Sequence, residues 1–180
     1  MRDVDAPVIP VTPDLRIDPP GSGTEADTLV AFLAYQRATV VRKMGGLTAV
    51  QLSSRSVAPS TLSPLGIVRH LTEVERYWLT EVLLGDDLDD LYCSRDDRDG
   101  DFHNGTPESA PLDVAAWIEE VRRAGTHVAA WPGLDHPSYG RRRGQPVSLR
   151  WILLHLVEEY ARHLGHLDLL REAIDGVTGE

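Results

Sequence analysis

Four side chains of types that bind metal ions recur along one face of a helix predicted for residues 148–174. At about 100° per residue, His155, Glu159, His163 and His166 fall within an arc of about 80° that borders the apolar face of this helix. Polar groups at that position cost free energy unless a partner or an ion satisfies them. The pattern therefore indicates a metal site, a polar network between helices or a polar dimer interface, and spacing alone leaves all three open.

Spacing within the arc narrows the choice of ligands for one ion. Glu159 and His163 are an i,i+4 pair and His163 and His166 an i,i+3 pair, so adjacent turns can direct either pair at one ion. His155 and His163 are separated by a rise of roughly 12 Å, too far for one ion with bonds of about 2.1 Å. We expect His155 to support a ligand or line the cavity. His166 is expected to be a fourth ligand or a group that bonds to a ligand.

A second helix, predicted for residues 64–84, adds His70 on its apolar stripe. A single histidine there is usually a hydrogen-bonded core residue. Because Glu159 and His163 lie on another core-facing surface, the three side chains from two helices constitute a candidate open metal site. The sequence has no HExxH motif, no CxxC pair and no GxSxG motif, so the catalytic residues stay unassigned.

Three further side chains are candidates for contact with a substrate or a cavity. Tyr77 and Glu81 lie on the same side of their predicted helix as His70. Arg37 lies beside Met44 on an apolar face, where most arginines extend toward solvent. The alternative for Arg37 is a clamp for a substrate carboxylate.

Four helices are predicted to position these residues. Apolar side chains recur at helical spacing in four segments, and no segment alternates with a period of two. The segments are residues 26–44, 64–84, 112–130 and 148–174. Their number and length predict an all-α four-helix bundle.

The predicted bundle occupies residues 24–176 as a single domain. Residues 1–23 are rich in proline and have no helical period, which predicts an extended N-terminal segment lying along the surface. Residues 45–62 are predicted to be a polar connection.

Two long loops are predicted between the later helices. Residues 85–110 contain eight aspartates between Asp86 and Asp101, which indicates a solvated acidic loop. A calcium loop is rejected because Phe102 stands where such a loop needs glycine. Residues 131–147 contain Arg141–Arg143, which are either plain surface residues or an anion-binding edge for an acidic substrate.

Composition restricts the partners and the compartment. The 180 residues carry a net charge of −10, which argues against nucleic acid and anionic membrane surfaces as partners. No apolar run reaches the roughly 18 residues that cross a bilayer, and no secretory signal is visible. The single cysteine, Cys93, favours a reduced, cytoplasmic setting, and its aspartate neighbours are expected to raise its pKa and make it a poor nucleophile.

Three blocks of the chain resemble the DinB-like superfamily of metal-binding four-helix bundles, most closely an actinobacterial branch of unknown function. The resemblance covers residues of about 27–175. The blocks are YQRATVVRKMGGLT (Tyr35–Thr48), LGIVRHLTEVERYW (Leu65–Trp78) and SLRWILLHLVEEYARHLGHLDLLREAIDG (Ser148–Gly176).

The resemblance implies a ligand set and a class of chemistry. One histidine from the second helix and two ligands four residues apart on the last helix correspond to His70, Glu159 and His163. The carboxylate at Glu159 looks like the variant of mycothiol-dependent isomerases, and many relatives have glutamine at the position of His166. Characterised relatives are often thiol S-transferases or isomerases that hold zinc or nickel, which implies a divalent metal, a small-molecule thiol and an electrophilic substrate.

The amino-acid composition also bears on the identity of the thiol. Lys43 is the only lysine among 18 basic residues, a bias typical of GC-rich bacterial genomes, which favours mycothiol over bacillithiol. The alternatives to a transferase, isomerase or hydrolase are a non-catalytic, stress-related metal- or ligand-binding bundle and a structural helical homodimer with a polar seam.

Overall fold

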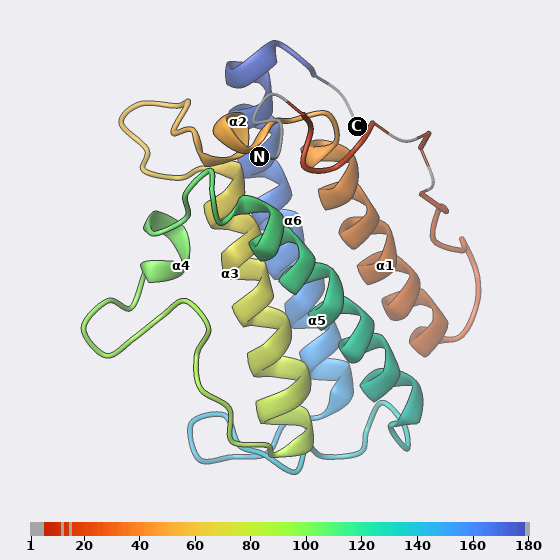
Figure 1. Cartoon of the computed structure of the whole chain (residues 1–180). Coiled ribbons are helices and arrows are strands. Elements are labelled where there is room, and N and C mark those ends of the chain that lie inside the picture. Colours follow the sequence, from red (N-terminus) through yellow and green to blue (C-terminus); the bar gives the residue numbers. More distant parts are fainter. Residues whose placement is uncertain (1–5, 12, 15, 179–180) are drawn as a thin grey trace.

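Helices account for all the regular secondary structure that the computed structural model describes, which covers residues 6–11, 13, 14 and 16–178 (Figure 1). The all-α prediction is confirmed. The elements are α1 (Glu25–Met44), α2 (Ala49–Ser53), α3 (Pro64–Arg76), the π-helical segment η1 (Tyr77–Val82), α4 (Gly100–His103), α5 (Ala110–Ala130) and α6 (Leu149–Asp175).

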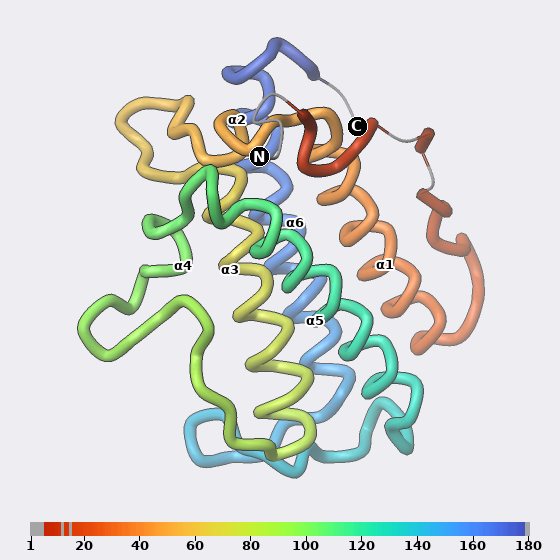
Figure 2. Tube along the Cα trace, viewed as in Figure 1, coloured from red at the N-terminus to blue at the C-terminus, as the bar shows by residue number. Residues whose placement is uncertain are grey.

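Four long helices lie side by side, with α1 against α6, α5 against α3, and α3 against α6 (Figures 1 and 2). Their bounds agree with the predicted segments to within two residues at most ends. The second predicted helix differs because it changes from α-helical to π-helical hydrogen bonding at Tyr77. The core between the helices consists of leucine, isoleucine, valine and methionine side chains with Trp78, Trp117 and Tyr160.

Local signals in the sequence fix the helix starts. The Ser63 side chain accepts a hydrogen bond from the Gly66 N–H at 3.1 Å, and Pro64 occupies the first turn of α3. The Ser148 side chain accepts from the Trp151 N–H in the same way at the start of α6. These caps set where α3 and α6 begin and therefore which of their side chains face each other.

A buried polar network takes one side chain from each long helix. The Arg37 guanidinium donates to both carboxylate oxygens of Glu75, at 2.7 and 2.6 Å. Tyr160 donates to the same carboxylate at 2.6 Å, and Trp117 donates to the Tyr160 oxygen at 3.0 Å. Glu75 is only 1% exposed, so the network fixes the four helices in one register.

The N-terminal segment is hydrogen-bonded to the turn that follows α1. The Val8 N–H donates to the Leu47 carbonyl at 3.0 Å, and the Gly46 N–H donates to the Ile9 carbonyl at 2.9 Å. Gly46 has a φ of 83°, a conformation that favours glycine. The prediction of an extended segment for residues 1–5, 12 and 15 lies outside the described residues. None of the described helices combines the length and apolar character needed to cross a membrane.

Most aspartates of the predicted solvated acidic loop are exposed, but Gly100 and Asp101 are buried within α4. The cause lies in α3. Arg69, which is 6% exposed, donates to the carbonyls of Asp101 at 3.0 Å and Gly100 at 3.3 Å, and to the Asp113 carboxylate at 3.0 Å. The predicted polar connection at residues 45–62 likewise contains a helix, α2, which begins at a Thr48 capping box.

Close packing of α4 on α3 depends on a glycine. A Cβ atom at Gly66 would lie 2.4 Å from the Phe102 carbonyl oxygen, so only glycine permits this approach. The contact brings Asp101 and Phe102 beside His70.

Candidate metal centre

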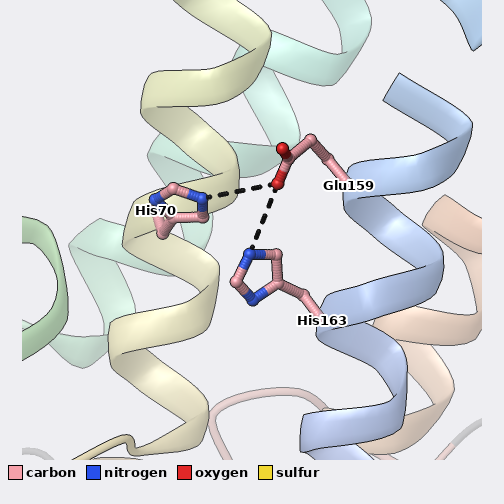
Figure 3. A group of neighbouring side chains, drawn as sticks. All are labelled: His70, Glu159 and His163. Carbon is pink, nitrogen blue, oxygen red and sulfur yellow. Dashed lines mark ion pairs between the residues drawn. The ribbon is translucent and has the colours of Figure 1, made fainter. Parts of the chain in front are cut away.

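Three predicted ligands converge between α3 and α6. His70 projects from α3, and Glu159 and His163 project from successive turns of α6 toward it (Figure 3). One ligand atom of each lies within 4.8 Å of the others. The Glu159 Oε2 atom is 3.5 Å from His163 Nε2 and 4.0 Å from His70 Nε2.

These separations suit a common ion better than direct bonding. A tetrahedral ion with bonds of about 2.1 Å holds its ligand atoms about 3.4 Å apart. Hydrogen bonds between nitrogen and a carboxylate oxygen are shorter, about 2.7–2.9 Å when charged. The Glu159–His163 separation of 3.5 Å matches that spacing, and the His70–Glu159 separation of 4.0 Å is somewhat longer than it.

The two oxygens of Glu159 have different surroundings. Oε2 faces His70 and His163, whereas Oε1 accepts a hydrogen bond from Arg162 at 3.1 Å and lies 3.6 Å from His155 Nε2. Arg162 thus holds the carboxylate from its outer side. This arrangement leaves Oε2 as the oxygen available to an ion.

His70 is oriented by the acidic segment. Its Nδ1 atom lies 2.8 Å from Asp101 Oδ2, and its ring stacks on Phe102 with centroids 4.5 Å apart and planes 22° apart. A carboxylate bonded to one ring nitrogen holds the proton there and presents the lone pair of Nε2. Asp101 was not among the predicted site residues, because its place depends on the docking of α4 rather than on helical spacing.

His163 is held in the form that a metal ligand needs. Burial lowers its pKa to about 3, and a positive charge on His70 or His166 acts in the same direction. The imidazole is therefore neutral near pH 7. His166 Nδ1 lies 3.4 Å from His163 Nδ1, the nitrogen that faces away from Glu159. The structure thus places His166 beside a ligand and outside the group of three ligand atoms.

His155 belongs to an aromatic cluster beside the centre. Its ring stacks on Trp151 at a centroid distance of 5.0 Å and meets Trp78 edge-on at 4.7 Å. His155 also forms a second group of potential ligand atoms with Glu158 and Glu159. In that group Glu158 is exposed and pairs with Arg162, which makes it the weaker candidate.

The remaining candidates are not part of the group of three ligand atoms. Tyr77 is exposed and meets Trp78 edge-on at 5.0 Å. Burial raises the pKa of Glu81, and Asp90 of the acidic segment adds to the shift. Arg37 lines a pocket of about 410 Å³ between α1, α5 and α6, but its guanidinium is paired with Glu75.

The thiol of Cys93 is not activated. Its pKa is raised to about 11, mainly by burial, with Asp101 and Glu73 as negative neighbours. The expected direction is correct, although burial contributes more than the aspartates. Cys93 is therefore protonated near pH 7.

Comparison with known proteins gives a family and no individual relative. The search of curated proteins found no match. Residues 28–176 match the model of the Mycothiol-S-transferase family. This range contains the four long helices nearly in full and the three converging side chains. This family lies within the DinB-like superfamily that the sequence blocks resemble. The chain therefore belongs to the Mycothiol-S-transferase family.

Proposed function

We propose that this protein is a divalent-metal-dependent thiol S-transferase that joins the sulfur of mycothiol to a carbon of a small electrophile. The observation that carries the proposal is the convergence of His70, Glu159 and His163 in a chain that belongs to the Mycothiol-S-transferase family. The isomerase and hydrolase alternatives would use the same centre.

The donor set supports zinc as the metal, with nickel as the second choice. Two imidazole nitrogens and one carboxylate oxygen are ligands that zinc accepts, and three protein ligands leave a position for substrate. A cation held there supplies positive charge that lowers the pKa of a thiol beside it, so that the nucleophilic thiolate forms near pH 7.

The surrounding residues prepare the site for this chemistry. Asp101 orients the ring of His70, and burial keeps His163 neutral, so His163 has no proton to lose when a cation binds. Arg162 offsets part of the negative charge of Glu159. In the transfer itself the thiolate sulfur forms a bond to carbon, the leaving group departs with its electron pair, and the thiol proton passes to solvent.

The test begins with metal content. Purified protein is expected to bind one zinc or nickel ion per chain by mass spectrometry, and H70A and H163A are expected to lose it. The control is H136A, because His136 packs on Trp131 and contacts none of the three ligands. Mycothiol conjugation to a chromogenic electrophile should follow metal content across these variants.

Two results would contradict the proposal. A protein that takes up no divalent ion in a titration has no metal centre. A loaded protein without saturable turnover across a panel of thiols and electrophiles is instead a metal- or ligand-binding protein, the non-catalytic alternative. Size-exclusion chromatography with light scattering tests the proposed homodimer, and cell fractionation tests the proposed cytoplasmic location.

A further inference from the structure

Arg142 is stacked on two tryptophans beside the candidate metal centre. Its guanidinium carbon lies 4.7 Å from the centroid of the Trp151 ring and 5.5 Å from that of Trp78. Within the described part of the chain, no ion pair joins this guanidinium to a carboxylate. Arg37 and Arg69, which are also largely enclosed, both pair with acids.

The stacked position leaves the hydrogen-bonding edge of the guanidinium available. A guanidinium on an aromatic ring uses its flat face, whereas its five N–H donors lie in its plane and point outward. Two parallel donors match the two oxygens of a carboxylate. Arg142 can therefore bind an anionic group through its N–H donors and keep its contact with Trp151.

The backbone around Arg142 is built to hold it there. The Arg142 N–H donates to the Gln145 carbonyl at 2.8 Å and the reverse bond is 3.0 Å, closing a two-residue turn. Both turn residues have positive φ, 49° at Arg143 and 82° at Gly144, as a type I′ turn requires. A non-glycine residue in that conformation costs free energy, which the two backbone hydrogen bonds between Arg142 and Gln145 help to offset.

A second anchor ties this loop to the end of η1. The Gly140 N–H donates to the Val82 carbonyl at 3.0 Å, and the Tyr139 N–H donates to the Leu83 carbonyl at 2.9 Å. A Cβ atom at Gly140 would lie 2.3 Å from the Glu81 carbonyl oxygen, so the approach requires glycine. η1 is π-helical, a rare conformation that often marks functional sites, and it carries Trp78.

A continuous row of side chains connects Arg142 to the metal ligands. Trp78 and Trp151 contact the His155 ring, and His155 Nε2 is 3.6 Å from Glu159 Oε1. Trp151 and Glu159 are separated by a rise of roughly 12 Å along α6, about the length of a small organic molecule. A substrate that reacts at the centre can thus reach Arg142 with its far end.

We propose that Arg142 binds the carboxylate of a substrate whose reactive atom lies at His70, Glu159 and His163. This inference rests on the proposed function. Trp151 is 37% exposed, and its accessible atoms contact the apolar body of that substrate. The substrate class is a carboxylate-bearing electrophile with an aromatic or apolar middle, because mycothiol, the proposed thiol, carries its cysteine carboxyl group as an amide.

Binding to metal-free protein tests the site without any turnover. The probes are 4-methylphenylacetate and its neutral amide, titrated while tryptophan fluorescence is recorded. The wild-type chain is expected to prefer the carboxylate, and R142Q to bind it roughly 10- to 100-fold more weakly. The matched control is R143Q, which removes the same charge from the next residue, whose side chain is exposed. R143Q should bind as the wild type does.

Turnover then identifies which substrate carries the carboxylate. The electrophiles are 4-(bromomethyl)phenylacetate and its amide, from which the thiolate displaces bromide and forms a carbon–sulfur bond. A KM raised by R142Q for the acid alone assigns the carboxylate to the electrophile. The second comparison uses N-acetylcysteine and its amide as thiols with one fixed neutral electrophile. If R142Q raises the KM for N-acetylcysteine alone, the carboxylate belongs to the thiol.

The proposal is overturned if wild-type protein binds the acid and the amide equally, or if R143Q weakens binding as much as R142Q. In the first case the stack is structural, and in the second only the general charge of the loop matters. Absence of turnover in every variant, with the carboxylate preference intact in the titration, would remove the S-transferase proposal and leave the anion site standing.

Discussion

A single carboxylate controls how His70 faces the candidate metal. Asp101 is 4% exposed and bonds the nitrogen of His70 that points away from Glu159. Such partners of metal-bound histidines typically contribute 10–100-fold to metal affinity. We therefore predict that D101A binds zinc about 10–100-fold more weakly, measured by competition with a chromophoric chelator.

The same loop supplies the control for Asp101. Asp99 has an exposed side chain that makes no capping bond, so D99A removes an equal charge without touching His70. Zinc affinity in D99A should equal that of the wild type. Equal losses in D99A and D101A would show that the net negative charge of the segment matters and the orientation of His70 does not.

Cys93 offers a second prediction at the scale of one residue. Burial raises its pKa from 9.0 to about 11, so at pH 7.5 its thiolate fraction is about 100-fold lower than that of an ordinary cysteine. We expect labelling by a thiol reagent to be slower by about this factor and to accelerate up to pH 11. Labelling at the rate of a free cysteine would contradict it, and C93S should retain full activity.

At the scale of elements, local patterns determined the long helices but not α4. The apolar periods and the serine caps of α3 and α6 are encoded within each helix, so sequence could predict them and the convergence of His70 with Glu159 and His163. The four residues of α4 have no such period. Their position comes from Arg69 and Gly66, which lie more than thirty residues earlier in the chain.

The sequence alone could not show which of the three consecutive arginines would bind an anion. The three consecutive arginines suggest an anion-binding edge, but nothing local distinguishes them. The structure does so because the turn at Arg143–Gly144 and the anchor at Gly140 place only Arg142 on the tryptophans. Arg141 instead donates to the Gly144 carbonyl at 3.0 Å.

Docking of α4 predicts a strong effect of one methyl group. G66A would force the Phe102 carbonyl away from α3 and carry Asp101 from His70, so zinc affinity should fall while helix content by circular dichroism stays constant. G125A is the control, since a Cβ there meets nothing within 4 Å. It should stabilise α5 by about 0.5–1 kcal/mol and leave zinc affinity unchanged.

At the scale of the whole molecule, the buried network decides how the four helices fit together. Arg37, Glu75, Trp117 and Tyr160 each come from a different long helix. Arg37 and Tyr160 donate to the Glu75 carboxylate, and Trp117 donates to Tyr160. Burial raises the pKa of Tyr160 well above its usual value, and the charge of Glu75 adds to the shift, so its hydroxyl remains a donor. Such a network favours one helix register over others at some cost in stability.

Removing the central charge is therefore predicted to destabilise the fold more than removing an exposed one. E75Q leaves the Arg37 guanidinium buried without a counter-charge, and the free energy of unfolding in urea should fall by about 3–5 kcal/mol. E119Q, which breaks a surface pair with Arg122, should change it little. Replacing Arg37, Glu75 and Tyr160 together by Met, Leu and Phe should recover most of the loss, because no charge is then left buried.

Stability and kinetics together separate the two roles considered for Arg37. If Arg37 serves the network, R37M lowers the unfolding free energy and leaves the KM for a carboxylate substrate unchanged. If Arg37 instead clamps substrate, R37M raises that KM and unfolds at nearly the wild-type urea concentration. The bidentate bond to Glu75 favours the first outcome, since both oxygens of that carboxylate already occupy the donors that a substrate would need. Anion recognition would then fall to Arg142, whose donors are not so occupied.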